Sequence, residues 1–204
     1  MPSAPNTRRP WPMKWIVLTI ALVIVPYTFL TLHYRKPGPA YRPYQDAQER
    51  ANVVRLLSAG YQRITLSAQR PADPVRGSAT APTMAALGGL PSALVATLVQ
   101  KPLLPAEILA VTAAPSVSAL LPYPIQFTCT LPDNKQQLAG AALYIRDAEI
   151  IITPDFELLA GDLLARSRES IILLTVPARA LKAGSYRITL AGQRSSRSWA
   201  LQVH

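Results

Sequence analysis

The side chains that could carry out chemistry in this chain are few and widely spaced. The histidines are His33 and His204, and the single cysteine is Cys129. Nucleophilic catalysis needs a nucleophile held by a base that a third group orients, and these two histidines supply no Ser-His-Asp or Cys-His set. We therefore expect no catalytic residues and predict that the protein is not an enzyme.

The sequence also lacks the patterns that bind metals or redox cofactors. The methionines Met1, Met13 and Met84 form no copper-ligand cluster with Cys129. One thiol allows neither an internal disulfide nor a zinc motif, and no C-x-x-C-H haem-attachment motif is present. We predict no metal site and no cofactor.

Acidic residues gather between residues 147 and 162. Carboxylates in a loop can bind Ca²⁺, but their spacing here does not match an EF-hand. We interpret the cluster as a solvated acidic rim between strands. Its members are Asp147, Glu149, Asp155, Glu157 and Asp162.

Residues 15–32 carry no charged side chain, and basic residues flank them on both sides. A helix of this length is roughly 27 Å long, close to the hydrocarbon core of about 30 Å. The run is longer than a typical signal-peptide core and no small-x-small cleavage site follows it. We predict a cytoplasmic tail at residues 1–14 and a transmembrane helix at residues 15–33. The residues expected to anchor or pack this helix are Trp11, Trp15, Pro26, Tyr34, Arg35 and Lys36.

The net charge of +10 is unevenly distributed. Residues 34–76 hold eight basic and three acidic residues, whereas residues 107–204 hold nine and eight. Basic residues beside a span usually meet lipid phosphates or an acidic subunit, and the folded part has no basic-aromatic motif. We expect membrane lipids and other subunits as partners, and no nucleic acid. A short tail before a large β-rich domain favours the inner (cytoplasmic) membrane, single-pass, with the C-terminal domain on the periplasmic side.

Residues 34–69 are expected to form an extended juxtamembrane stretch, a helix at 45–59 and a strand at 61–68. Apolar side chains fall near one face of the helix. Two interpretations stay open: the helix packs on its own domain, or it lies on the membrane surface or on a partner. In the second case Val53, Val54 and Leu57 bind that partner.

Residues 70–106 are rich in alanine and proline and carry few charges. Their apolar side chains follow no regular pattern, and proline fixes φ at six positions. The segment is either a flexible linker or an extended segment that lies along a neighbouring subunit, outside the β-domain. In the second case its partner-binding residues are Leu87, Leu90, Leu94 and Leu98.

Residues 107–204 alternate apolar and polar side chains in short runs that turn signals separate. About seven such strands predict an all-β fold, an Ig-like antiparallel β-sandwich. Tyr186 matches the tyrosine corner of such sandwiches, and Trp199 begins the last alternating run, so we expect both to be structural. Cys129 falls on an apolar face and is expected to be a small buried core residue.

The segment LTVPARALKAGSYRITLAG, followed by SWALQV, resembles the end of bacterial membrane-tethered Ig-like domains. With its short tail, one span and the juxtamembrane Tyr34, Tyr41 and Tyr44, the chain is similar to FixH-type proteins, which accompany cbb3-type terminal oxidases. The similarity covers the span and residues 123–204. The resemblance implies an accessory place beside an energy-converting membrane complex.

These features together predict a non-catalytic, single-span accessory or structural subunit of a larger respiratory or photosynthetic membrane complex. Its span, extended segment and β-domain would hold neighbouring subunits. One alternative is a stand-alone assembly factor or metallochaperone for such a complex. Another is a membrane-tethered sensor that binds a ligand.

Overall fold

The computed structural model describes residues 12–34, 43–74, 80–161 and 163–204, which form two separate units. The first unit contains helix α1 (Met13–Tyr34), which continues through Pro26. Its window Met13–Thr31 is long and apolar enough to cross a membrane, and none of that window is buried within the chain. The hydroxyls of Thr19 and Thr28 donate to carbonyls one turn earlier, at 2.8 and 2.7 Å, so these polar groups need no water.

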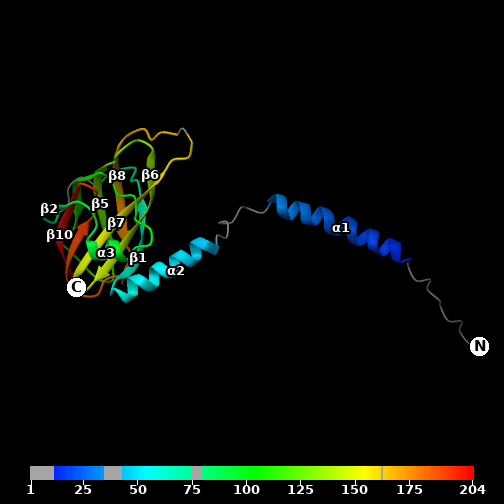
Figure 1. Ribbon diagram of the computed structural model, residues 1–204, viewed down its shortest axis with the longest axis horizontal. Helices are drawn as coiled ribbons and strands as arrows, with labels where there is room; N and C mark the ends of the chain where they lie inside the picture. The colour runs from blue at the N-terminus through cyan, green and yellow to red at the C-terminus, as the bar shows by residue number, and fades with distance from the viewer. Residues whose placement is uncertain (1–11, 35–42, 75–79, 162) are drawn as a thin grey trace, which may run out of the picture. The chain divides into compact units, whose positions relative to one another are not determined.

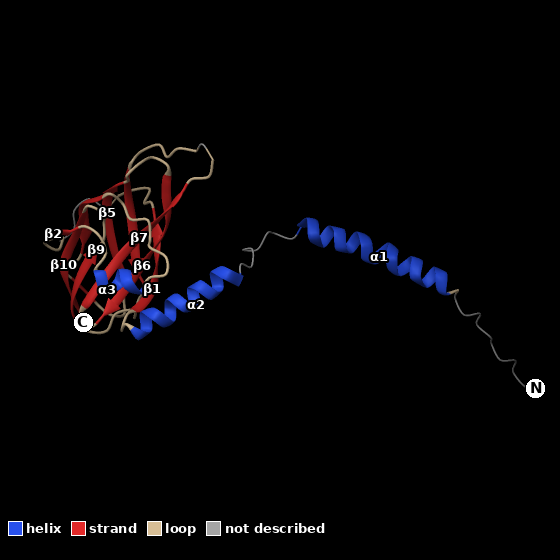
Figure 2. Ribbon diagram, viewed as in Figure 1, coloured by secondary structure: helices blue, strands red, loops and turns tan. Residues whose placement is uncertain are grey.

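The second unit is a β-rich domain with two short helices (Figures 1 and 2). Its elements are, in order, α2 (Pro43–Ser58), β1 (Gln62–Gln69), β2 (Met84–Leu87), α3 (Ser92–Thr97), β3 (Glu107–Ala113), β4 (Ser116–Val117), β5 (Tyr123–Thr130), β6 (Gln136–Arg146), β7 (Glu149–Leu158), β8 (Glu169–Val176), β9 (Gly184–Leu190) and β10 (Ser195–Val203).

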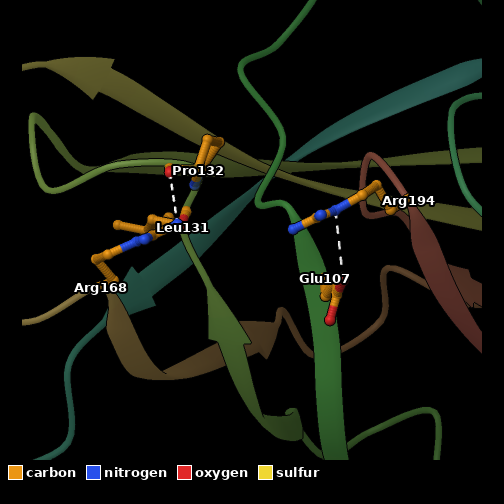
Figure 3. A network of polar contacts seen from close by, with 5 residues as sticks. All are labelled: Glu107, Leu131, Pro132, Arg168 and Arg194. Carbon is orange, nitrogen blue, oxygen red and sulfur yellow. Dashed lines mark hydrogen bonds and ion pairs between the residues drawn. The ribbon is translucent and has the colours of Figure 1, made fainter.

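Eight of the strands close into a barrel. Each strand pairs with the next in the order β10-β3-β5-β8-β1-β6-β7-β9, and β9 pairs with β10 again. Of the neighbouring strands in the barrel, β10 and β3 share the fewest paired residues: Ser195 pairs with Glu107, and the two strands run parallel. Arg194 strengthens this seam, because its Nε lies 3.3 Å from the Glu107 carboxylate and its backbone N–H donates to the Ala106 carbonyl (Figure 3).

The barrel differs from the expected two-sheet Ig-like sandwich at residues 107–204. Strand β1, which precedes that range, lies between β8 and β6 and joins strands that a sandwich would keep in separate sheets. In addition, β7 pairs with β9 in parallel, so the strands are not all antiparallel. The sheet therefore starts near residue 62, because β6 and β8 both need β1 as a hydrogen-bonding partner.

The barrel encloses the main hydrophobic core, in which Phe127, Cys129 and Trp199 are almost fully buried. The Trp199 indole donates to the Tyr123 hydroxyl at 3.1 Å, and that hydroxyl donates to the Ala114 carbonyl at 2.7 Å. Burial raises the pKa of Tyr123 to about 12, although the hydrogen bond from Trp199 opposes this shift. The prediction that Cys129 is a buried core residue is confirmed, and burial raises the pKa of its thiol to about 12.

A second apolar layer covers the outside of β6 and β7. Both strands bury consecutive residues, so their outer side chains need a cover as well as their inner ones. Leu56 near the end of α2, helix α3 and Leu98 after it supply this cover, and Figure 2 shows α3 lying against the sheet. This outer cluster consists of Leu56, Tyr61, Leu94, Leu98, Ala142, Tyr144 and Ile151.

Residues 80–106 of the alanine- and proline-rich segment are part of the domain, which corrects both interpretations of that part of the segment. Leu94 is 0 % exposed and Leu98 is buried in the outer cluster. Strand β2 pairs with residues Ser195–Ser198 of β10. Gly88 lies so close to the backbone of residues 193 and 194 that a Cβ would sit 2.3 Å from it. The apolar residues of the segment follow no regular period because the segment packs against the domain through isolated side chains.

The tyrosine corner is present although the sandwich is not. The Tyr186 hydroxyl donates to the Lys182 carbonyl at 3.1 Å, four residues earlier, and its ring packs against the main core. This confirms the local prediction for Tyr186. The corner fixes the turn before β9 without requiring two separate sheets.

We predict that Leu94→Ala lowers the free energy of unfolding by about 2–5 kcal/mol, because it leaves a cavity in the outer cluster. Leu87→Ala is the matched control, since Leu87 is 95 % exposed, and should cost less than about 0.5 kcal/mol. Urea unfolding of the full chain in detergent measures both values. Equal effects would mean that residues 90–104 do not belong to the core.

We also predict that Tyr123→Phe costs about 1–3 kcal/mol, because the Trp199 indole and the Ala114 carbonyl both lose their partner in a buried place. Tyr186→Phe should cost about 0.5 kcal/mol, since water replaces its hydroxyl at the surface. The same unfolding measurement compares them. A larger loss of unfolding free energy for Tyr186→Phe than for Tyr123→Phe would contradict the assignment of the Tyr123 hydroxyl as a buried partner of Trp199 and Ala114.

Candidate functional site

A cleft of about 770 Å³ opens beside the outer cluster. Its floor is the outer face of β1, β6 and β7, and its walls are α2 and residues 99–103. The backbone N–H of Val99 donates to Asn52 Oδ1 at 3.3 Å, which ties one wall to the other. The cleft exists because α2 and residues 99–103 cover the sheet only in part.

Asp155 lines this cleft from β7, as does Glu157 two residues later. The Asp155 Oδ1 accepts a hydrogen bond from the Leu103 backbone N–H at 3.1 Å, and Phe156 N–H donates to the Leu103 carbonyl at 3.1 Å. Burial raises the pKa of Asp155, although the Leu103 hydrogen bond and the charge of Arg63 oppose the shift. Asp155 is half-buried, so it is less solvated than the expected rim but still in contact with water.

Of the other members of the expected acidic rim, Glu157 lines the same cleft, whereas Asp147 and Glu149 lie at the connection from β6 to β7. Asp147 lies in the β6–β7 turn with a φ of 54°, a conformation that aspartate tolerates. Glu149 lies 3.8 Å from Arg146, and Glu157 accepts a hydrogen bond from the Gln137 side chain at 2.7 Å. Asp162 is outside the described residues.

Two hydroxyls lie on the floor of the cleft. Tyr144 and Thr153 are buried on neighbouring strands and share a side-chain hydrogen bond, and Thr153 also donates to the Ala142 carbonyl at 3.3 Å. Burial raises the pKa of Tyr144, while the charge of Arg63 on β1 opposes the shift. Arg63 is opposite Tyr144 in the strand register, and its own side chain is exposed.

The backbone at one end of the cleft is irregular. The register of β6 against β7 shifts between Leu138 and Gly140, so Ala139 forms a β-bulge. A Cβ on Gly140 would meet no atom within 4 Å, which shows that the cleft is open there. A bulge leaves backbone groups unpaired, so they can bind a ligand.

The cleft is suited to binding a polar molecule that has both donors and acceptors. Arg63 and Lys101 offer positive charge, while Asp155 and Glu157 accept hydrogen bonds. Within the described residues, no group of three or more His, Cys, Asp or Glu side chains is placed to hold a metal ion.

The predicted partner-binding residues divide into two sets. Val53, Val54 and Leu57 on α2 are 45, 66 and 63 % exposed, and Leu87 on β2 projects into solvent. Leu94 and Leu98 are buried in the outer cluster and Leu90 packs against it, so the prediction that these three contact a partner is corrected.

The predicted anchoring residues are described only in part. Trp15 is exposed on α1, and Pro26 is inside the same helix. Trp11, Arg35 and Lys36 are outside the described residues, as is the side chain of Tyr34. Of the predicted structural residues, Trp199 is 1 % exposed in the main core.

The cleft residues were missed by the sequence interpretation. Arg63 and Thr65 lie on a strand that was expected outside the domain, and Asp155 was expected in solvent. The signal available was the run Ile150–Ile151–Ile152, which is too apolar for a strand with one wet face. Such a run implies that a second layer of the chain covers the outer face of the strand. A cleft can open where that layer ends.

We predict that Asp155→Asn raises the free energy of unfolding at pH 7. Because the folded-state pKa of Asp155 is raised, the folded protein binds its proton more readily, and stability falls as the pH rises from about 4 through that pKa. Asparagine keeps an acceptor for the Leu103 N–H without the charge. The gain over the wild type should therefore vanish as the pH is lowered toward 4.

Asp155→Ala is the control, because it removes the acceptor and should destabilise the domain at pH 7. Urea unfolding at a series of pH values checks both variants. A stability gain of Asp155→Asn that grows toward low pH would contradict the assigned burial of this carboxylate.

Comparisons of the chain with protein-family models, with curated proteins and with solved structures found no match. The role of the domain therefore has to be inferred from its own residues.

Proposed function

We propose that this protein is a non-catalytic, single-span accessory subunit of a larger energy-converting membrane complex, and that its β-domain holds a neighbouring subunit on the periplasmic side of the inner membrane. The support for the anchor is α1, whose apolar side chains are exposed and pack against nothing else in the described residues. A helix of this kind is stable in a bilayer and unstable in water.

The observation that carries the proposal is the edge of the sheet at β2. In the described part of the chain, β2 pairs with β10 and with no other strand. Its side chains Met84 and Leu87 are 66 and 95 % exposed. An apolar edge strand without charge or proline is a template for another strand, so such edges are normally covered.

Further exposed leucines support a surface that meets other proteins. Leu158, Leu163 and Leu164 lie in and around the connection from β7 to β8 and are each more than half exposed. Isolated exposed leucines are ordinary, but grouped ones favour an interface.

We predict that the full chain, purified in a gentle detergent, retains subunits of an electron-transport or proton-translocating complex at a fixed ratio. Leu87→Asp should abolish this retention without changing the stability of the domain, because the side chain makes no buried contact and a charge blocks strand addition. Mass spectrometry identifies the partners and their ratio.

Leu121→Asp is the matched control, since Leu121 is also mostly exposed but lies in the turn before β5. It should leave the retention unchanged. A monodisperse monomer without partners, or equal retention by the wild type and Leu87→Asp, would sink the proposal of a subunit held through β2.

The cleft favours a second candidate, a membrane-tethered protein that binds a small polar ligand. Its volume fits a small molecule, and Arg63 and Asp155 offer complementary groups to a ligand that carries both a carboxylate and an amine. Free amino acids and dipeptides are the probes to use. They should raise the melting temperature of the wild type and not that of Arg63→Ala if this candidate is correct.

A further inference from the structure

Helix α2 has two faces with opposite character. Asn52 and Leu56 are buried against the domain, whereas Val53, Val54 and Leu57 are exposed. At about 100° per residue, Val54 lies opposite the buried pair, and Val53 and Leu57 fall between Leu56 and Val54 around the helix. We call Val53, Val54 and Leu57 the α2 stripe.

The length of chain between the two units limits how far the α2 stripe can be from the membrane. α1 ends at Tyr34 and α2 begins at Pro43, so only residues 35–42 join them. Such a connection spans at most roughly 30 Å when fully extended. If α1 crosses the bilayer, the first turn of α2 stays within that distance of the membrane surface.

Basic residues outnumber acidic ones around the α2 stripe, because residues 35–58 hold five basic residues and two acidic ones, Asp46 and Glu49. Arg50 is exposed and lies one turn before Val53 and Val54 on the same side of the helix, whereas Arg55 is exposed on the flank far from Val53 and Leu57. The connecting residues add Arg35, Lys36 and Arg42. Glu49 lies next to the buried face, where it lines the cleft as well as the hollow beside Arg50.

We propose that the α2 stripe lies on the surface of an anionic membrane, with its aliphatic side chains among the upper acyl chains and Arg50 at the lipid phosphates. This is the arrangement of interfacial amphipathic helices, which combine a small apolar face with flanking basic residues. The buried face of α2 holds the β-domain, so the helix fixes one side of the domain to the bilayer. The inference rests on the membrane anchoring in the proposed function and not on the subunit held at β2.

The test uses the full chain reconstituted into vesicles of phosphatidylcholine with phosphatidylglycerol. Val54→Cys is labelled with an environment-sensitive fluorophore. Cys129 is 0 % exposed and its thiol is protonated at neutral pH, so the wild type should not react and serves as the labelling control. Ala178→Cys, in the exposed turn between β8 and β9, is the position expected to stay in water.

The expected result is emission at shorter wavelength from Val54→Cys and quenching by nitroxide-labelled lipid, with neither effect at Ala178→Cys. Exchanging Arg50 for glutamate should reduce the quenching, as should vesicles of phosphatidylcholine alone. Resistance to alkaline carbonate extraction reports separately that α1 is inserted. Extraction of the protein would overturn the anchor and this inference together.

Two results would overturn the inference while the anchor stands. One is an inserted protein whose Val54 label remains in water and is not quenched by lipid. The other is a label that is shielded in native membranes but not in lipid vesicles, because a protein partner would then cover the α2 stripe.

Discussion

The constraint on which the domain depends is that β6 and β7 carry apolar side chains on both faces of the sheet, so both faces must be covered. Leu143, Ile150 and Ile152 face the barrel core, while their neighbours Tyr144 and Ile151 face outward and are equally buried. A strand with one wet face would place polar side chains at those outer positions. The outward residues therefore require a second layer, which the chain forms from α2 and residues 90–104.

This covering layer explains the two surfaces from which function is inferred. Because it stops short of the end of β7, it leaves the cleft around Asp155, and the loop at residues 99–103 becomes its wall. Because α2 uses Leu56 to cover the sheet, Val53, Val54 and Leu57 remain exposed on other sides of the helix. The edge at β2 has a different origin, since β2 extends the sheet at the point where β3 and β10 barely pair.

The parts of the structure that follow from local pattern were predictable. The apolar run at residues 15–32 is a helix, the alternating runs are strands, and the tyrosine corner at Tyr186 forms as expected. These features depend on side chains close in sequence. Trp199 and Cys129 were also placed correctly, because period-two alternation assigns a residue to the inner face whatever the order of the strands.

The features that depend on distant pairing were not predictable from one sequence. Strand β1 was recognised, but nothing in its residues indicates that it joins β6 to β8 and so closes a barrel. Leu94 and Leu98 lie in a segment whose apolar residues follow no regular period. The sequence therefore looks the same whether these leucines pack inside the domain or contact a partner. The cleft combines both problems, because Arg63 and Asp155 come together only after the barrel and its cover have formed.

Hydrogen exchange of the full chain, followed by mass spectrometry, tests the covering layer most directly. The amides of Tyr61 and Leu98 donate within the layer, at 2.8 and 3.1 Å, and that of Val99 donates to Asn52. If the layer is part of the fold, the peptides that span residues 52–61 and 90–104 should exchange as slowly as those of β6 and β7. Exchange of residues 90–104 at the rate of an unstructured peptide, while β6 and β7 stay protected, would contradict the account.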